Sequence, residues 1–528
     1  IYFVVALGNP IPALADTGSS SSHTIMARLN GTRLGAIRAY FFGFFICTAG
    51  FLFGYDTGVV GGVLTLKSYI KDFGYTDETT VSAVMVSLQN AGAFFAALGI
   101  FPISDRFGRK YTIQVSMLVF CIGIVLQVSP SHSLVCFYIG RVISGIGLGS
   151  ATAVVPAYSA EMAPKEIRGM VGGGMQGLFA MGVMISYWID YGVEIGLPEI
   201  SRQWQIPVGL QLVPAAVLGL GLIPMPESTR WLAKKGRIEE ALKALQWIRA
   251  SEGAEVKAEF NEIQVGLEEE LRATEGLKKR ELLEPANRYR IALAFFMFLA
   301  QQCTGMTSLA YFGPQFFKTL VGNNNSQSLL ITGLFGAEKF VSCSTYLLFF
   351  SEMWGRKPTL YITAFLMAIC FVIVTVLHET TIAITPSGPT SAGIATVAMI
   401  FVTNAIYQFS WGPIVWPYTA EIFPSRIREI GVSVAVSTQW LFNFLFSLVT
   451  PYMIASMGSY TFIFFAVCDI IMGLVVIFFV KETRGKSLEE METLFHSKAA
   501  FDVAAARDKA RTSADFHHNE EAGPSIEA

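Results

Sequence analysis

Twelve apolar runs of about 20 residues constrain the fold of this chain more than any other feature. A helix of that length rises about 30 Å, the thickness of the hydrocarbon core of a bilayer. Because lipid leaves unpaired backbone groups unsatisfied, each run is expected to be helical. Only 15% of the 528 residues are charged and the mean hydropathy is +0.49, which excludes a soluble protein. The runs cover residues 39–62, 82–102, 111–129, 134–157, 168–190, 206–225, 290–317, 328–351, 359–377, 394–419, 430–454 and 460–480.

Two similar basic turns follow apolar runs about half the chain apart, which indicates an internal duplication. They are Asp105-Arg106-Phe107-Gly108-Arg109-Lys110 and Glu352-Met353-Trp354-Gly355-Arg356-Lys357. Duplicated many-helix membrane proteins usually work by alternating access between their halves. We therefore predict an all-α membrane protein, with twelve transmembrane helices in two six-helix bundles and a short cytosolic helical domain between them.

Basic residues concentrate in alternate loops, which predicts the orientation of the chain. These residues are Arg106, Arg109, Lys110, Lys165, Arg168, Arg356, Lys357, Arg426, Arg428, Lys481, Arg484 and Lys486. The positive-inside rule places their loops and both termini in the cytosol. The long loop 226–288 carries a Glu- and Lys-rich stretch with helical periodicity, as expected of a cytosolic helical domain. The plasma membrane is the expected location.

The predicted organisation has five parts. They are a cytosolic arm (1–38), a first bundle (39–225), a cytosolic linker (226–288), a second bundle (289–480) and a cytosolic tail (481–528). A basic arm follows Met26, which indicates Met26 as a start of the natural chain. The sequon at Asn324 lies in an outer loop close to the membrane, so its glycosylation stays open.

The composition gives no sign of catalysis, cofactors or nucleic-acid binding. All seven cysteines fall inside apolar runs without metal-ligand spacing, so they are expected to be reduced packing thiols. No nucleophile–base constellation and no metal motif is present in the sequence, and an enzyme is not expected. The net charge of −2 does not favour a nucleic-acid partner. The lipid bilayer and a small-molecule substrate are the expected partners.

Asp56 and Arg141 are ionisable residues inside apolar runs, where a charge is costly and therefore indicates function. Asp56 lies roughly 24 Å from the cytosolic face and Arg141 roughly 10 Å from the outer face, counted along their helices. In a core about 30 Å thick these depths nearly coincide, so the two residues can pair. Such a carboxylate can bind a proton when the arginine moves away. The alternative is a static ion pair that braces two helices.

Uncharged polar side chains also gather within the apolar runs. They are Gln176, Gln301, Gln302, Thr307, Gln439 and Asn443, with Trp416, Trp440, Tyr311 and Tyr407 as aromatic companions. Amides both donate and accept, which suits a ligand covered in hydroxyls, and aromatic faces suit sugar C–H groups. The alternative is hydrogen bonding between helices, which uses the same residues in membranes. Gly305, Gly313-Pro314, Gly412-Pro413 and Pro417 predict interrupted helices near this set.

An ordered set of motifs from about residue 40 to 490 resembles the sugar porter family of the major facilitator superfamily. The matching segments are Gly108-Arg109-Lys110, Gly140-Arg141, Pro156 to Glu161, Pro164 to Gly169, Pro226-Glu227-Ser228-Thr229-Arg230-Trp231-Leu232, Gln301-Gln302, Trp354-Gly355-Arg356-Lys357, Gly412-Pro413-Ile414-Val415-Trp416, Glu421-Ile422-Phe423-Pro424 and Lys481-Glu482-Thr483-Arg484-Gly485. One such motif would be weak evidence, but the ordered set is specific.

The resemblance implies roles for most of the residues singled out above. It implies a sugar site made by Gln176, Gln301, Gln302, Trp416, Gln439, Trp440 and Asn443. It also implies that Asp56 couples transport to protons, because passive members of the family usually lack an acid there. Cytosolic ion pairs that close an inner gate are implied for Arg109, Glu161, Arg168, Arg356, Glu421 and Arg428. Topology-setting charge is the alternative for these six.

Two departures from the family pattern leave the substrate open. Thr307 stands where members normally have Asn, and Lys339 stands where many have Asn. Lys339 lies near the middle of its run, roughly 20 Å from the cytosolic end, so it needs an anion nearby. A pairing with Glu338 or a helix carbonyl is the alternative. Lys339 and the segment Tyr187 to Gly192 resemble the quinate-permease branch of fungal sugar porters.

The sequence therefore favours a proton-coupled symporter of monosaccharides. A carrier of an acidic sugar or a quinate-like hydroxy acid is the alternative. A sugar sensor without transport activity is disfavoured, because such sensors tend to have much longer C-terminal tails.

Overall fold

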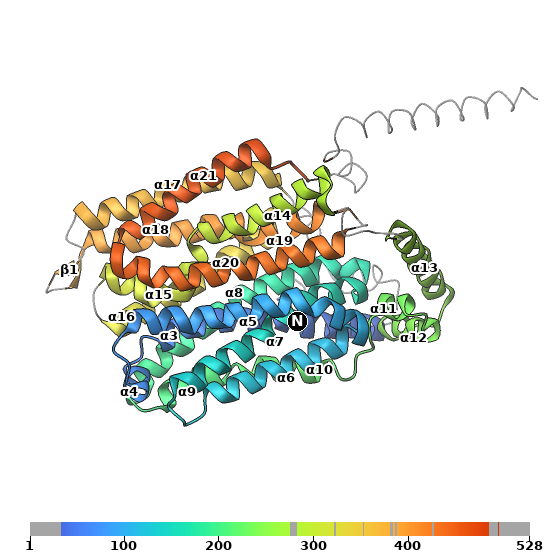
Figure 1. Cartoon of the computed structure of the whole chain (residues 1–528), viewed down its shortest axis with the longest axis horizontal. Helices are drawn as coiled ribbons and strands as arrows, with labels where there is room; N and C mark the ends of the chain where they lie inside the picture. The colour runs from blue at the N-terminus through green and yellow to red at the C-terminus, as the bar shows by residue number, and fades with distance from the viewer. Residues whose placement is uncertain are drawn as a thin grey trace, which may run out of the picture.

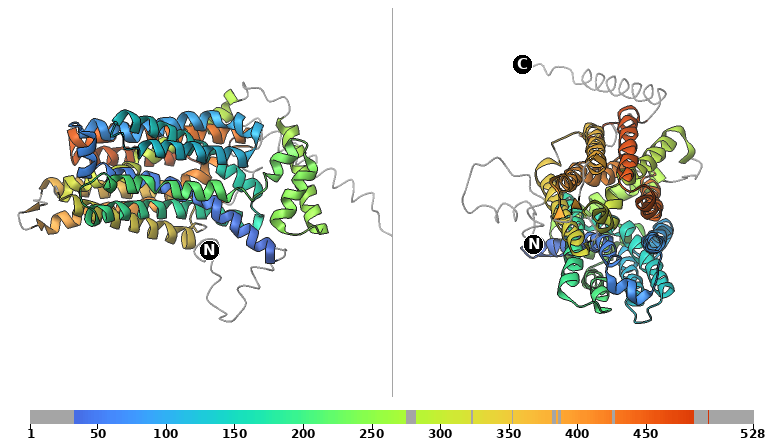
Figure 2. Two further views of the ribbon diagram at one scale, coloured as in Figure 1. Left: turned by 90° about the horizontal axis from the view of Figure 1, so that it is seen from below. Right: turned by 90° about the vertical axis from the view of Figure 1, so that its left-hand side faces the viewer.

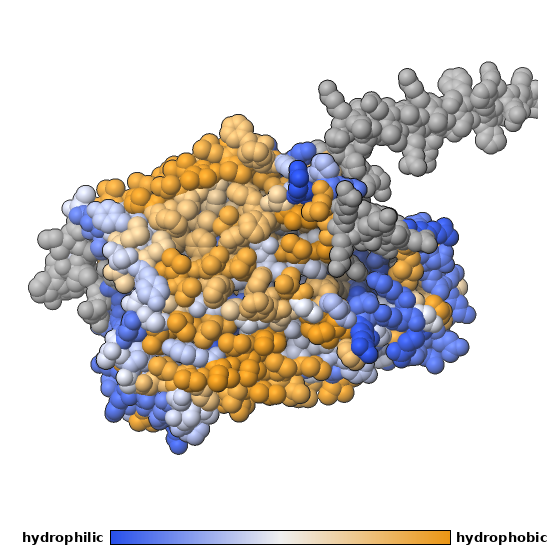
Figure 3. Space-filling view, viewed as in Figure 1, coloured by the Kyte–Doolittle hydropathy of each residue, from blue (hydrophilic) through white to orange (hydrophobic). Residues whose placement is uncertain are grey.

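The computed structural model describes residues 33–274, 282–321, 324–351, 353–380, 384–385, 388–424, 427–484 and Phe495. Long helices run side by side along the longest axis of the molecule (Figure 1). An apolar belt covers the middle of this face, and hydrophilic residues lie towards its two ends (Figure 3). Met26, most of the predicted N-terminal arm and the predicted tail beyond residue 484, Phe495 excepted, lie outside the described residues.

The regular elements in the first half of the described chain are all helices. Asp77 starts α5 by accepting a hydrogen bond from the backbone N–H of Thr80 at 3.0 Å, and Gly108, with φ of 100°, turns the chain from α5 into α6. The elements are α3 (Arg33–Val63), α4 (Lys67–Phe73), α5 (Glu78–Phe107), α6 (Arg109–Gln127), α7 (Leu134–Met162), α8 (Lys165–Gly196), α9 (Arg202–Gly209) and α10 (Leu212–Gly221).

The second half contains the interruptions that its glycines and prolines predict. Gly305, with φ of 72°, separates two helices, and Phe312 leaves helical geometry just before Gly313-Pro314. Another break falls at Ser410. The elements are α14 (Pro285–Cys303), α15 (Met306–Val321), α16 (Asn325–Thr345), the π-helix η2 (Tyr346–Phe350), α17 (Arg356–Thr380), β1 (Ile384–Thr385), β2 (Gly388–Pro389), α18 (Ser391–Gln408), α19 (Trp411–Glu421), α20 (Arg428–Met457) and α21 (Tyr460–Phe479).

Eleven helices in the described residues are long and apolar enough to cross a membrane. Eleven of the twelve predicted runs correspond to them. The predicted run 328–351 falls on α16 and η2, where Glu338, Lys339 and several hydroxyl residues lower the hydropathy. The eleven segments are Leu34–Val63, Glu78–Phe107, Arg109–Gln127, Leu134–Met162, Glu166–Gly196, Arg202–Gly221, Pro285–Lys318, Arg356–Thr380, Ser391–Glu421, Ile430–Met457 and Tyr460–Phe479.

Helices of each half pack chiefly on one another, and a few helices join the halves. In the first half α3 packs on α8, and α7 packs on both α5 and α6; in the second, α17 packs on α18 and α21. Across the halves α5 packs on α20, α8 on α16 and α3 on α15. Figure 1 shows α17, α18 and α21 at one edge, α6 and α10 at the other, and the joining helices between them. A site formed by the joining helices therefore receives residues from both halves.

Three further helices lie across one end of the long helices (Figure 2). They are α11 (Thr229–Lys234), α12 (Ile238–Arg249) and α13 (Ala254–Thr274). Arg249 fastens them to the rest through ion pairs with Glu166 of α8 at 3.1 Å and Glu259 of α13 at 2.6 Å. Arg38 of α3 donates to the backbone oxygen of Trp247 at 2.7 Å. These contacts mark the end of the bundle that the sequence predicts to face the cytosol.

Candidate functional site

Asp56 and Arg141 meet in the interior of the first half. Arg141 Nη1 of α7 lies 3.4 Å from Asp56 Oδ1 of α3, and the two residues are only 1% and 3% exposed. The guanidinium also donates through Nε to the backbone oxygen of Met85 at 3.1 Å. The distance of 3.4 Å between Arg141 and Asp56 is long for an ion-paired hydrogen bond, which is ordinarily about 2.7–2.9 Å. The two side chains are therefore paired, at a longer distance than a strong ion-paired hydrogen bond.

Two amides of α5, which the sequence did not indicate as site residues, lie next to Asp56 and to the second half. Gln89 Nε2 donates to Asp56 Oδ2 at 2.6 Å, which is shorter than the contact with Arg141. Asn90, the next residue, donates to Ser447 Oγ of α20 at 3.0 Å and accepts from Tyr311 Oη of α15 at 3.4 Å. The signal was available, since two adjacent amides inside an apolar run have to find polar partners.

Four of the five amides predicted to bind sugar, Gln301, Gln302, Gln439 and Asn443, lie buried on α14 and α20, which belong to one half. Gln302 and Asn443 are 0% and 2% exposed, and Gln439 is 6% exposed. Both polar atoms of Gln302, together with Gln439 Oε1 and Asn443 Oδ1, lack a hydrogen-bond partner among the described residues. Each such group costs about 1–3 kcal/mol when left unpaired. A hydroxylated ligand that paired with them would recover this free energy.

Gln301 differs from its neighbour because it stabilises the second half internally. Its Nε2 donates to the backbone oxygen of Trp411 at 2.8 Å, where the chain breaks between α18 and α19. Tyr407 lies beside both Gln301 and Thr307. The half-buried Trp416 packs on Phe298, one turn before Gln302, with ring centroids 5.1 Å apart. Gln301 thus positions the broken helix, while Trp416 and Thr307 lie near the amides.

A chain of aromatic rings connects Lys339 to the amide region. Lys339 Nζ of α16 lies 5.3 Å from the ring centre of Phe179 on α8. Phe179 packs on Phe53 of α3 at 4.9 Å, and Phe53 packs on Trp440 of α20 at 5.2 Å. Trp440 lies between the positions of Gln439 and Asn443 on its helix. The rings of Phe179 and Phe53 therefore lie between the ammonium and Trp440, and rings from both halves connect Lys339 to the helix of the amides.

Lys339 has no carboxylate partner within ion-pair distance among the described residues, although it is only 4% exposed. The neighbouring carboxylate of Glu338 is engaged elsewhere. It accepts from Ser342 Oγ at 2.5 Å and from Asn404 of α18. Gln176, also half-buried, lies on α8 one turn before Phe179, and its backbone oxygen contacts Cys343 of α16. Lys339 is thus a buried cation packed on an aromatic ring.

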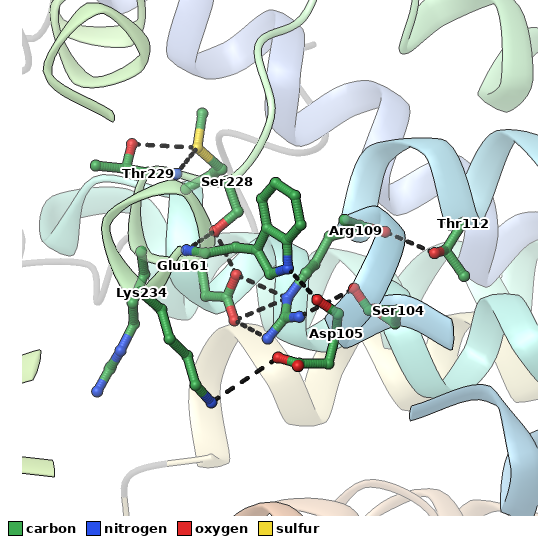
Figure 4. A network of polar contacts seen from close by, with 12 residues as sticks. Ser104, Asp105, Arg109, Thr112, Glu161, Ser228, Thr229 and Lys234 are labelled. Carbon is green, nitrogen blue, oxygen red and sulfur yellow. Dashed lines mark hydrogen bonds and ion pairs between the residues drawn. The ribbon is translucent and has the colours of Figure 1, made fainter. Parts of the chain in front are cut away.

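The first of the two basic turns is held by an ion-pair network within the first half (Figure 4). Arg109 Nη2 lies 3.0 Å from Glu161 Oε1 at the end of α7. Glu227 accepts from the backbone N–H groups of Arg109 at 2.9 Å and Lys110 at 3.0 Å, at the start of α6. Ser228 donates to Glu161 and closes the network. A carboxylate at a helix start is favourable because the backbone N–H groups there are otherwise unpaired.

The second basic turn repeats this network in the second half. Arg356 Nη2 lies 3.1 Å from Glu421 Oε1, and Thr483 donates to Glu421 Oε2 at 2.8 Å. Glu482 accepts from the backbone N–H groups of Arg356 and Lys357 at 2.9 and 3.0 Å. Burial by itself would raise the pKa of Glu482, but four backbone N–H donors outweigh it and the pKa is lowered.

Both of these ion pairs lie within a half, and the two remaining gate residues form no ion pair among the described residues. Arg168 donates to the backbone oxygen of Ala163 at 3.4 Å, and Arg428 donates to that of Phe423 at 3.3 Å. At the opposite end of the bundle the halves are joined. Gln315 donates to Ser82 at 3.0 Å, and further contacts join Tyr187 to Ala310, Asn325 to Glu194 and Thr80 to Tyr452.

This geometry agrees with the comparison to known proteins. Residues 42–495 match the family described as sugar (and other) transporter. The chain belongs to this family. It is a membrane transporter of the sugar porter type, within the major facilitator superfamily.

Similar curated proteins and solved structures refine the comparison. The quinate permease of Emericella nidulans is 35% identical over 463 residues, covering 85% of this chain and 86% of that protein. A probable quinate permease of Aspergillus niger is 34% identical over 488 residues, with 89% of each chain covered. The proton:xylose symporter XylE, bound to 6-bromo-6-deoxy-D-glucose, superposes with a TM-score of 0.71 at 25% identity. That match covers 88% of this transporter and all of XylE. An inward-open structure of XylE from E. coli gives the same TM-score at 24% identity, covering 87% of this chain and all of that one.

Proposed function

We propose that this transporter carries a polyhydroxylated carboxylic acid of the quinate kind together with a proton, by alternating access. Lys339 carries the proposal, because it is a buried cation without a carboxylate partner among the described residues, and a row of aromatic rings connects it to the helix of the amides. A buried ammonium is costly unless an anion is near. A substrate carboxylate at Lys339 would supply that anion. The names of the quinate-permease relatives support the same substrate class.

The membrane topology proposed here has twelve spans, with α16 and η2 as the eighth. Asn325 to Phe350 is a continuous helical stretch, and its 26 residues rise about 39 Å, enough to cross a bilayer core. Its polar residues face protein, since Glu338 bonds to α18 and Lys339 lies on Phe179 of α8. Two six-helix bundles, residues 39–225 and 289–480, then flank a cytosolic linker, residues 226–288. Cytosolic termini and the plasma membrane complete the proposed topology.

The hydroxyl groups of the substrate are assigned to the amides. Gln302, Gln439 and Asn443 present unpartnered polar atoms on one half, while Lys339 would hold the carboxylate. Trp440 and Trp416 offer ring faces for the C–H groups of the substrate. Gln176 and Thr307 lie at the margins of this site, and Gln301 orients the backbone around it.

Asp56 is proposed to carry the proton, with Arg141 as its partner. Ionised Asp56 is stabilised by Arg141 and Gln89, and protonation would remove the charge that attracts Arg141. Symport of one proton with one carboxylate moves no net charge, so the membrane potential would not oppose uptake. Proton coupling would therefore allow an acidic substrate to enter the cell against a membrane potential that is negative inside.

The contacts between the halves at one end of the bundle support an inward-facing state. Contacts join the halves at the end opposite α11–α13, while Arg168 and Arg428 form no ion pair at the other end among the described residues. We propose that the Arg109–Glu161 and Arg356–Glu421 networks keep each half rigid and present charged surfaces. Arg168 and Arg428 would complete the inner gate when the halves close there.

A neutral monosaccharide is the second candidate substrate. The amide and aromatic set alone suits a sugar, and the likeness to the proton:xylose symporter favours this reading. Under this reading Lys339 would be structural, held by its contact with Phe179. The two candidates therefore differ in what Lys339 does.

Uptake into a host without its own sugar porters would separate the candidates. We would compare labelled quinate, galacturonate, glucose and xylose with the intact transporter and with Lys339→Asn. Lys67→Asn is the matched control, since the Lys67 side chain is 71% exposed. The proposal expects uptake of the acids by the intact transporter, lost in Lys339→Asn only. Uptake of the neutral sugars alone, unchanged in Lys339→Asn, would establish the second candidate.

A further inference from the structure

Adjacent amides on α5 connect the carboxylate of Asp56 to the contact between the two halves. Gln89 points to one side of the helix and donates to Asp56 Oδ2 at 2.6 Å. Asn90 points to another side and donates to Ser447 Oγ of α20 at 3.0 Å and to the backbone oxygen of Asn443 at 3.4 Å. Both residues are at most 2% exposed. One turn of α5 thus contacts the proton-binding residue and the opposite half at once.

A second connection returns from the opposite half to the same carboxylate. Tyr311 of α15 donates to Asn90 Oδ1 at 3.4 Å and faces Asp56. The titratable groups that face Asp56 among the described residues are therefore Tyr311 on α15 and Arg141 on α7. Gln89 supplies the hydrogen-bond donor from α5.

We propose that Gln89 and Asn90 form a coupling element, in which Gln89 senses the protonation state of Asp56 and Asn90 passes it to the α5–α20 contact. The proposal rests on the proposed proton coupling and assigns these two residues a role within it. They are positioning residues, because they contact the proton-binding carboxylate and the opposite half and are not themselves assigned to the substrate.

The chemistry of an amide suits this role. Ionised Asp56 accepts a hydrogen bond from Gln89 Nε2, while Gln89 Oε1 has no partner among the described residues. Protonated Asp56 is a donor, and it would pair with Gln89 Oε1 after the amide rotates by half a turn. Gln89 therefore offers a partner to each form of the carboxyl group, in two different side-chain orientations. The orientation of Gln89 then follows the proton.

Asn90 connects the position of α5 to α20 of the opposite half through hydrogen bonds. Its bonds to Ser447 and to the backbone at Asn443 hold α5 on α20, and α20 also carries the proposed substrate amides. A shift of α5 that accompanies rotation of Gln89 would strain or release these bonds. Buried polar networks of this kind have discrete arrangements, so a small change at one end is transmitted.

The test measures the ratio of protons to substrate in proteoliposomes that contain the full-length transporter. Proton entry is followed with a trapped pH dye and substrate entry with labelled quinate, in parallel. The variants are Gln89→Leu, Ser447→Ala and their combination. The control is Gln114→Leu, an amide of α6 that bonds to the backbone of Gly219 in the same half.

The proposal expects the proton-to-substrate ratio to fall in Gln89→Leu by several-fold, towards about tenfold if one hydrogen bond of about 1.4 kcal/mol sets the coupling. Ser447→Ala, which removes one hydroxyl, should lower the ratio in the same direction. The combination should be no worse than Gln89→Leu, because both residues act on one connection. Gln114→Leu should keep the ratio of the intact transporter.

The remaining outcomes distinguish failure of the coupling element from failure of the proposed symport. An unchanged ratio in both Gln89→Leu and Ser447→Ala, with proton entry in the intact transporter, would overturn the coupling element alone. Losses that simply add in the combination would also overturn it. Absence of substrate-driven proton entry in the intact transporter would overturn the proposed symport itself. If Gln89→Leu does not fold, Ser447→Ala decides the matter.

Discussion

Replacing Lys339 by Met should change substrate binding and the stability of the empty transporter in opposite directions. Truncating one member of a buried charge pair costs about 2–5 kcal/mol, so acid binding should weaken by roughly 30- to 5,000-fold. A neutral sugar would lose no ion pair. The predicted loss is therefore specific for acids such as quinate.

The empty transporter should become more stable in the same variant. A lysine at mid-membrane costs about 2.5–3.5 kcal/mol, and its contact with the ring of Phe179, 5.3 Å away, returns about 0.5–2 kcal/mol. The difference is a net cost of about 0.5–3 kcal/mol, which Met would remove. The melting temperature without ligand should then rise by up to a few degrees.

Purified Lys339→Met, Lys339→Arg and the intact transporter would be compared by thermal melting with and without quinate, and by direct binding of labelled quinate. Lys339→Arg keeps the charge and should retain acid binding. Equal quinate affinity in Lys339→Met and the intact transporter would refute the assignment of the substrate carboxylate to Lys339. A lower melting temperature for empty Lys339→Met would refute the argument that the ammonium is unpaired.

Three further predictions follow from the same geometry. Asp56→Asn should abolish uptake against a gradient but leave exchange of substrate across the membrane, as measured by counterflow; accumulation by this variant would remove the proton role from Asp56. Gln302→Ala should weaken substrate binding by about 5- to 150-fold, equivalent to about 1–3 kcal/mol for one buried partner, and an unchanged affinity of the purified, folded variant would remove Gln302 from the site. Glu482→Gln should lower the melting temperature at neutral pH, because the lowered pKa of Glu482 means that ionisation stabilises the fold. This contribution is present above the unfolded pKa of about 4.3 and is lost as the pH falls through the lower folded pKa, so a gap between variant and intact protein that persisted at acid pH would contradict it.

The sequence predicted the features that depend on length, hydropathy and depth. The apolar runs anticipate eleven of the helices, because spanning a bilayer requires their length and composition. The estimated depths of Asp56 and Arg141 in the membrane nearly coincide, which predicted that they can pair. Their side chains lie 3.4 Å apart. The two basic turns indicated an internal duplication, and in the structure each turn is held by an equivalent ion-pair network.

Features that depend on the direction of a side chain were not predictable in this way. Gln89 and Asn90 are adjacent, and only packing decides that one faces Asp56 and the other α20. The ion pairs of Arg109 and Arg356 were expected to close a gate, but in this conformation they lie within each half. Their role in closing the gate stays a prediction, because a single conformation shows one set of partners.

Simultaneous recording of quinate and proton entry into proteoliposomes tests the central claim most directly. An outward-to-inward quinate gradient would be imposed on vesicles without a pH gradient, with trapped pH dye and labelled quinate followed together. The account predicts internal acidification in step with quinate entry, in equal amounts, with no dependence on an imposed membrane potential. Entry of quinate without acidification, or acidification driven by glucose and never by quinate, would contradict it.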